Sequence, residues 1–202
     1  GSIGERTADY FYPISIVEKE KILEKCREIK PDAVTTIASD LANITVQYVA
    51  SRLGLPGNSD ENIIISTNKY AMRQALLDGG VPTPKFVKVS EQDDFDKATK
   101  TMQYPLIVKP TDRSGSRGIT KVDTLKEIPK AVQSAVENAF EKHAIIEEYF
   151  EGEEYSCECI SYQGEHHVLA ITKKYTTGYP HFIETGHMEP ALLDEATVHL
   201  VE

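Results

Sequence analysis

The chain has 202 residues, enough for one large domain or two small ones. Its 22 basic and 32 acidic residues give a formal net charge of −10, which excludes general nucleic-acid binding because phosphate affinity needs a positive field. Hydrophobic residues make up 40% of the chain, as in globular proteins, and no apolar run approaches the roughly 20 residues of a membrane span. No signal-peptide pattern opens the chain, so we expect neither a membrane protein nor a secreted one.

The three cysteines, Cys26, Cys157 and Cys159, form no C-x-x-C motif. Cys157 and Cys159 flank a single residue, so on a strand both would point to the same face. A metal or redox pair is one interpretation of this spacing, but ordinary free thiols are the commoner one. An odd number of free thiols is typical of a reducing compartment, and we therefore expect a cytoplasmic protein.

The first 84 residues alternate helical and strand patterns, which is typical of an α/β unit. Ser39 and Asp40 can cap one of the helices, and Ser66 or Thr67 can cap another. The predicted elements are helices at 16–29, 41–53 and 68–78 and a buried strand at 33–38. Because one strand cannot make a doubly wound sheet, we expect residues 1–84 to be the tail of a larger α/β domain.

Residues 81–84 (VPTP) form a stiff linker, and the pattern changes after them. An antiparallel α+β module follows, with strands predicted at 85–89, 106–108, 119–122 and 144–149 and helices at 91–101 and 128–140. Beyond this module, residues 155–162 and 167–175 predict a hairpin, and a short helix is expected near 191–202. An isolated hairpin is only marginally stable, so we expect the last domain to continue past this chain.

The most informative segment is 104–119 (YPLIVKPTDRSGSRGI). A buried strand ends there in Lys109, and a small flexible loop with Gly115 and Gly118 follows. Glycines allow backbone N–H groups to fold over a phosphate, and the arginines of the loop supply charge. The loop matches neither a Walker A motif nor G-x-G-x-x-G, so a solvated hairpin loop is the alternative.

Residues 145–156 (IIEEYFEGEEYS) form a second candidate segment. Seven glutamates and no basic residue lie between 147 and 165, so this is no phosphate site. A chain leaving a strand can offer a backbone C=O and N–H pair to an adenine edge, and a nearby glutamate can accept hydrogen bonds from ribose hydroxyls. A charged surface turn is the alternative. One segment suits phosphates and the other a nucleoside, so together they predict a nucleotide site.

With these segments in order, residues 66–160 resemble the ATP-grasp superfamily, the ligase fold shared by biotin carboxylase, carbamoyl phosphate synthase and amino-acid ligases. Residues 68–84 are similar to its D-K-x-x-M-K…G-I-P-x-P segment, with Asn68 in place of the acid. Residues 104–122 are similar to its Y-P-x-I-x-K-P…G-x-x-G-x segment. Residues 147–155 are similar to its E-E-x-L-x-G-x-E-x hinge, with phenylalanine in place of leucine. The implied fold class is α/β (α+β), a truncated ATP-grasp fold preceded by the end of an α/β domain.

The resemblance implies a phosphate site for ATP. Lys69 and Lys109 would contact the phosphates, and Lys109 and Arg117 would stabilise charge on the transferred phosphoryl group. Residues 111–118 would form a flexible lid that excludes water from the reactive intermediate. The lid positions expected at the nucleotide are Ser114, Gly115, Ser116 and Gly118.

The resemblance also implies a nucleoside site at the hinge. The backbones of Glu148 and Phe150 would pair with adenine, with Glu147 beside them. Glu154 would hold the ribose. ATP and Mg²⁺ are the implied cofactors.

Residues 181–190 (HFIETGHMEP) resemble a loop of the ATP-grasp ligases that join two amino acids. Glu184 and His187 would there face the acceptor or the carboxylate substrate. A turn around Gly186 could aim both side chains into one pocket, whereas a straight strand would not. A structural role is the alternative for His187.

The family's magnesium ligands, a late acid and an E-x-N triplet, find no match after residue 160. We therefore assign no metal ligand to this chain and expect those ligands outside it. Three parts are predicted: residues 1–84 as the tail of a preceding α/β domain, 85–150 as the lid subdomain and 151–202 as the start of the C-terminal subdomain. We interpret the chain as the nucleotide-binding part of a longer enzyme, inactive alone.

The implied activity is that of an ATP-dependent carboxylate–amine ligase that acts on amino acids through an acylphosphate. Its expected partners are ATP and small carboxylate and amine substrates, and a homo-oligomer is left open. One alternative is phosphorylation of bicarbonate, as in carbamoyl phosphate synthase or biotin carboxylase. Another is a non-catalytic nucleotide-binding module.

Overall fold

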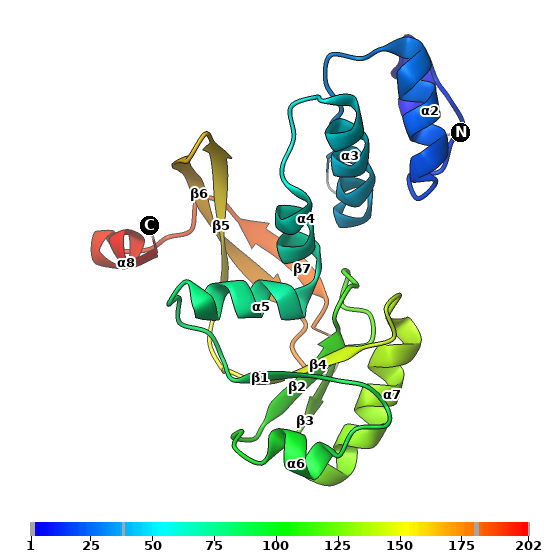
Figure 1. Ribbon diagram of the computed structural model, residues 1–202. Coiled ribbons are helices and arrows are strands. Elements are labelled where there is room, and N and C mark those ends of the chain that lie inside the picture. Colours follow the sequence, from blue (N-terminus) through cyan, green and yellow to red (C-terminus); the bar gives the residue numbers. More distant parts are fainter. Residues whose placement is uncertain (1–2, 38, 180–181, 202) are drawn as a thin grey trace. The chain divides into compact units, whose positions relative to one another are not determined.

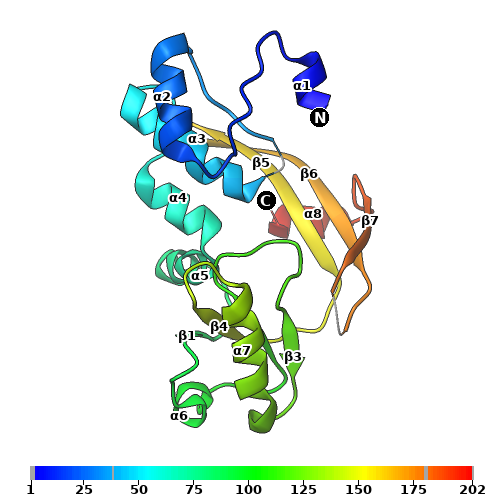
Figure 2. The same cartoon turned by 90° about the vertical axis from the view of Figure 1, so that its right-hand side faces the viewer.

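The computed structural model describes residues 3–37, 39–179 and 182–201 (Figures 1 and 2). The chain divides into two compact units, Gly1–Val81 and Pro82–Glu202. The division falls within the predicted proline linker at 81–84. Prolines restrict the backbone without adding contacts, so they suit a junction between two separate cores.

The first unit is built from helices. They are α1 (Ile3–Thr7), α2 (Lys19–Ile29), α3 (Asp40–Leu53), α4 (Asp60–Thr67) and α5 (Lys69–Asp78). α2 and α3 pack through a small apolar core in which Leu23, Cys26 and Val49 are buried. The helices predicted at 16–29 and 41–53 are confirmed as α2 and α3 with small shifts at their ends.

The buried strand predicted at 33–38 is wrong for the described residues 33–37. They form no strand, and Ile37 is 90% exposed; residue 38 lies outside the described part. β-branched residues favour a strand only where another strand can pair with their N–H and C=O groups. The described residues of the first unit contain no strand, so no such partner is present there.

Asn68, rather than Ser66 or Thr67, caps the helix predicted at 68–78. Its side-chain oxygen accepts hydrogen bonds from two backbone N–H groups of the first turn, at 3.0 and 3.1 Å, and Lys69 is the first residue of α5. Ser66 and Thr67 instead end α4, a helix that the sequence analysis missed. Asparagine caps a helix as well as aspartate does, so the replacement at position 68 preserves the helix start.

The second unit contains two antiparallel sheets. The first has the order β1-β4-β2-β3, with β1 (Phe86–Val89), β4 (Ala144–Glu148), β2 (Leu106–Pro110) and β3 (Thr120–Val122). A 3₁₀ turn (Leu125–Glu127) leads into α7 (Ile128–Asn138), which covers one face of this sheet. The predicted strands and the helix at 128–140 are confirmed. The helix predicted at 91–101 shortens to α6 (Phe95–Thr99), because Asp94 caps it.

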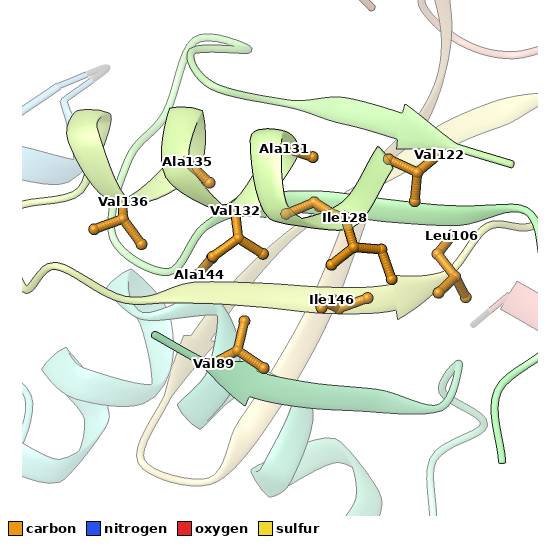
Figure 3. Close-up of a cluster of buried hydrophobic side chains, with 11 residues drawn as sticks. Val89, Leu106, Val122, Ile128, Ala131, Val132, Ala135, Val136, Ala144 and Ile146 are labelled. Atoms are coloured by element: carbon orange, nitrogen blue, oxygen red, sulfur yellow. The ribbon is translucent and has the colours of Figure 1, made fainter. Parts of the chain in front are cut away.

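The core of the second unit lies between the first sheet and α7 (Figure 3). Leu106 and Val108 of β2 are fully buried there, and Ile146 of β4 lies beside them. Ile128 and Val132 of α7 complete the contact. Because side chains alternate along a strand, the residues between these buried positions face the opposite side of the sheet.

The second sheet has the order β5-β6-β7, with β5 (Glu154–Tyr162), β6 (Glu165–Thr176) and β7 (Glu184–Met188), and α8 (Glu195–Val201) follows it. The predicted hairpin is confirmed as β5 and β6, and its turn residues Gln163 and Gly164 have φ of 51° and 86°. The loop expected at 181–190 is wrong in part, because residues 184–188 pair with β6 as a strand. Residue 181 lies outside the described part.

Candidate functional site

Lys109 and Glu147 form an ion pair on the face of the first sheet that lies away from α7. The register pairs Lys109 of β2 with Ile145 of β4, and Ile107 with Glu147, so the charged side chains are diagonal neighbours on one face. Lys109 Nζ lies 2.5 Å from Glu147 Oε2, and the two side chains are 18% and 2% exposed. Two residues predicted at the nucleotide are therefore in contact, and a buried carboxylate holds the lysine ammonium in place.

Lys109 does not lie at the exit of its strand, where the sequence analysis placed it. β2 continues through Pro110, which pairs with Ala144 of β4. Thr111 then donates its backbone N–H to the carbonyl of His143 at 3.3 Å. The ammonium is thus held over the sheet by pairing on both sides of it, and its position does not depend on the loop that follows.

The loop at 111–118 is anchored at its base and open at its tip. Asp112 accepts hydrogen bonds from the backbone N–H groups of Phe140 (3.0 Å) and Glu141 (2.7 Å). The Arg113 guanidinium lies 4.4 Å from the centre of the Phe140 ring. The exposed residues of the tip are Ser114, Gly115 and Arg117. A fixed base with an exposed tip is the arrangement that a lid needs in order to close over a ligand.

Positive φ angles give the tip its turn. Gly115, Ser116 and Gly118 have φ of 72°, 55° and 69°, a region that disfavours residues with a Cβ. The Ser116 hydroxyl donates a hydrogen bond to the carbonyl of Phe182 at 2.9 Å, which links the loop to the segment before β7. A Cβ at Gly118 would lie 3.2 Å from atoms of Asn138 and Pro110, so close packing also disfavours a larger residue there.

The segment after β4 corresponds to the predicted hinge. The Glu148 backbone N–H donates a hydrogen bond to the carbonyl of Lys85 at 3.0 Å and is therefore engaged within the sheet. If Glu148 pairs with adenine, it would do so through its own backbone carbonyl. The Glu148 carboxylate accepts from the Gln103 N–H at 2.8 Å. The Phe150 side chain is 70% exposed. Glu148 therefore also has a structural role that the sequence analysis did not predict.

Lys174 joins residues that were predicted for two different ligands. The register places Glu154, Lys174 and His187 side by side across β5, β6 and β7. Lys174 Nζ lies 2.8 Å from Glu154 Oε1 and 2.6 Å from Glu184 Oε1. Partial burial acts to lower the pKa of Lys174, but hydrogen bonds to both carboxylates outweigh it and raise that pKa. The hydrogen bond from Lys174 in turn lowers the pKa of Glu184.

A bulge in β7 brings Glu184 and His187 together. The register shifts between Tyr175 and Thr176 of β6, which makes Thr185 an extra residue in β7. Residues three apart on a regular strand point to opposite faces, but the extra residue restores a common face. Glu184 Oε2 consequently lies 3.4 Å from His187 Nε2. The expectation that a turn would be needed is corrected, because a bulged strand achieves the same result.

Lys174 was not among the predicted site residues, although the predicted hairpin contained the signal for it. A hairpin centred on Gly164 would place Lys174 opposite Glu154; the observed turn is centred between Gln163 and Gly164, and the extra residue Leu169 in β6 restores this pairing. Opposite charges that face each other across two strands predict an ion pair. The third strand, β7, adds Glu184 and His187 to the pair. No tight turn was predicted before it, so its register against β6 could not be read from the sequence.

The remaining predicted residue, Lys69, belongs to the first unit, whereas Lys109, the loop and the Lys174 cluster belong to the second.

Within the described ranges, no three or more His, Cys, Asp or Glu side chains are grouped so that they could hold a metal ion. None of the described helices is long and apolar enough to cross a membrane.

The fold and these motifs define an ATP-grasp domain, and the chain belongs to this family, whose domain model matches residues 102–202. The chain is 32% identical to alanine–anticapsin ligase of Bacillus subtilis strain 168, over 87% of this chain and 41% of that protein. It is 30% identical to a D-alanine–D-alanine ligase of Clostridium perfringens strain SM101, over 73% of this chain and 50% of that protein. The crystal structure of an L-amino acid ligase from Bacillus licheniformis superimposes with a TM-score of 0.76 at 27% identity, over 91% of this chain and 42% of that one. The chain thus spans half or less of the length of these three relatives.

Proposed function

We propose that the chain is the ATP-binding part of a ligase that joins a carboxylate to an amine through an acylphosphate, with amino acids as substrates. The observation that carries this proposal is the pair of Glu184 and His187, 3.4 Å apart and linked to Glu154 by Lys174. An amino acid brings an ammonium, which suits Glu184, and a carboxylate, which can accept a hydrogen bond from the His187 ring. Relatives named for ligating alanine or D-alanine support the same substrate class.

In the proposed reaction, a substrate carboxylate takes the terminal phosphoryl group of ATP, and an amine then displaces phosphate from the acylphosphate. Lys109 and Arg117 would balance the charge on the transferred phosphoryl oxygens. The loop at 111–118 would keep water away from the acylphosphate, which water would otherwise hydrolyse. Glu154 would orient the ribose.

Magnesium is the implied ion of such a reaction, but the described residues do not fit it. The candidate carboxylates Glu154 and Glu184 both bind the Lys174 ammonium, which lies between them, so they cannot share one divalent ion. No other group of acidic or histidine side chains in the described ranges is arranged to hold a metal ion. No step of the proposed reaction is therefore assigned to Mg²⁺ on residues of this chain.

Nucleotide binding by the chain itself is the first test. Titration with ATP in a calorimeter should give a Kd between high micromolar and millimolar, about −4 to −6 kcal/mol, because the lysines are present but the described residues form no group that could hold a metal ion. Lys109→Met should weaken this binding, and Lys126→Met, which changes an exposed lysine of the same unit, should not. Sub-micromolar binding would mean that the chain holds a complete metal site.

The substrate class is tested in the whole protein by ATP hydrolysis in the presence of each common amino acid or of bicarbonate. An amino acid should stimulate hydrolysis, and Glu184→Gln should raise its KM by roughly tenfold to a hundredfold, or about 1.5–3 kcal/mol. Glu165→Gln, at an exposed position of the same sheet, is the matched control. Stimulation by bicarbonate alone would establish the bicarbonate alternative, and nucleotide binding without stimulated hydrolysis would establish a non-catalytic module.

A further inference from the structure

Both ends of the loop at 111–118 are held at the C-terminal end of α7. The antiparallel register pairs Pro110 at the end of β2 with Ala144 at the start of β4, so the loop leaves the first sheet beside the segment that joins α7 to β4. At the other end of the loop, a Cβ on Gly118 would lie 3.2 Å from the side chain of Asn138, the last residue of α7. The tip of the loop therefore lies between two fixed points.

Asp112 makes the first of these fixed points. Its Oδ1 accepts a hydrogen bond from the backbone N–H of Phe140 at 3.0 Å, and its Oδ2 accepts one from the backbone N–H of Glu141 at 2.7 Å. The negative charge strengthens both bonds, and two bonds to one planar carboxylate fix its direction as well as its distance. The two donors follow α7, whose apolar side chains pack on the first sheet, so these bonds tie the loop to the core of the unit.

We propose that Asp112 is a positioning residue of the ligase reaction, which fixes the base of the loop so that the tip closes over the phosphates in one direction. Arg117, at the tip, lies five positions after Asp112, and the residues between them belong to no helix or strand. A change of direction at the base is therefore carried to Arg117, and a misplacement of about 1 Å can lower a rate by roughly a hundredfold. The effect on turnover rests on the proposed function, whereas the effect on the loop does not.

Hydrogen exchange of the whole protein, with and without saturating ATP, tests the effect on the loop. In the unchanged protein, ATP should slow the exchange of the amides of 114–117 by about tenfold or more, because a closed loop is shielded from solvent. Asp112→Ala removes both hydrogen bonds and should abolish most of this slowing. Asp112→Asn keeps one oxygen acceptor and should retain part of it.

Glu127→Ala is the matched control. The Glu127 carboxylate also accepts hydrogen bonds from two backbone N–H groups, those of Asp123 (2.8 Å) and Thr124 (2.9 Å), but it does so before the start of α7. The control thus removes the same kind of contact from the opposite end of the same helix. It should leave the slowing of exchange by ATP unchanged.

Turnover of the whole protein is measured with the amino acid that stimulates its ATP hydrolysis. Asp112→Ala should lower kcat by about tenfold to a hundredfold and change the KM of the amino acid by no more than about twofold, because a positioning residue acts through the loop and not on the substrate. The kcat of Asp112→Asn should lie between those of Asp112→Ala and the unchanged protein. Glu127→Ala should keep the kcat of the unchanged protein.

The inference would be overturned if ATP slowed exchange at 114–117 equally in the unchanged protein and in Asp112→Ala, or if Glu127→Ala lost the slowing as well. An unchanged exchange rate on addition of ATP to the unchanged protein would also overturn it, since the loop would then not close. If Asp112→Ala lost the slowing but kept its kcat, the role in the reaction would be wrong.

Failure of the proposed function gives a different result. In that case ATP slows exchange only where the Asp112 carboxylate is present, but no amino acid stimulates hydrolysis by the unchanged protein. The role of Asp112 in closing the loop then stands, and the ligase proposal does not. Circular dichroism checks that each variant is folded, and Asp112→Asn decides the question if Asp112→Ala is not.

Discussion

Replacement of Lys109 by methionine tests whether the Lys109–Glu147 ion pair stabilises the first sheet. Methionine keeps most of the side-chain volume and removes the charge. Glu147 is 2% exposed and its carboxylate lies 2.5 Å from the ammonium, so the substitution removes a cation from a carboxylate that water hardly reaches. A lysine at the very end of a strand would tolerate this substitution, but the buried ion pair predicts a loss of stability.

The magnitude follows from the burial of the two partners. Removal of one partner from a fully buried pair costs roughly 3–5 kcal/mol. The Lys109 side chain is 18% exposed, and some water therefore reaches the pair, so we expect about 2–4 kcal/mol for Lys109→Met. Glu147→Gln should cost about 1–3 kcal/mol, because the longer lysine side chain can turn its ammonium toward solvent.

The double variant, Lys109→Met with Glu147→Gln, measures the coupling. If the two side chains stabilise the sheet mainly through each other, the double variant should lose less unfolding free energy than the two single variants lose in sum, by about 1–3 kcal/mol. Urea unfolding followed by circular dichroism gives the free energies. Hydrogen exchange of peptides from β2 and β4 assigns the loss to this sheet, which matters because the chain has two units.

Lys126→Met is the control, since Lys126 is exposed in the same unit and its replacement should change stability by no more than about 0.5 kcal/mol. Equal stability of the Lys109→Met and Lys126→Met variants would refute the reasoning. The reasoning would also be refuted if the free energies of unfolding lost in the Lys109→Met and Glu147→Gln variants simply added in the double variant.

Three further predictions concern the rest of the candidate site. Lys174 lowers the pKa of Glu184, so the ion pair should stabilise the fold fully at pH values above the ordinary glutamate pKa of 4.5. This stabilisation should be lost as the pH falls through the lowered pKa of Glu184. The difference in Tm between the unchanged chain and Glu184→Gln should therefore become smaller in acid. Gly118→Ala should destabilise the chain by about 1 kcal/mol more than Gly115→Ala, since both have positive φ but only Gly118 has neighbours at 3.2 Å, and equal Tm values would contradict this. The backbone amides of 114–117 should exchange with solvent much faster than those of β2, and equal protection would count against a lid.

Local sequence patterns determined most elements of the second unit. The apolar run at residues 106–108 predicted β2, and the turn residues around Gly164 predicted the hairpin of β5 and β6. Such features depend on residues close together in the chain, and their energetics are therefore visible in the sequence. The strand predicted at 33–38 does not form in the described residues 33–37, because suitable residue types make a strand only where a second strand is present to pair with their backbone N–H and C=O groups.

The tertiary structure decided which distant residues share a site. The sequence assigned Lys109 and Glu147 to one nucleotide, but only the pairing of β2 with β4 makes them an ion pair over the sheet. Glu184 and His187 share a face only because β7 pairs with β6 and carries one extra residue. A bulge forms where the packing of two strands favours a shifted register, and that balance involves segments far apart in the chain, so the spacing of residues 184 and 187 could not reveal it.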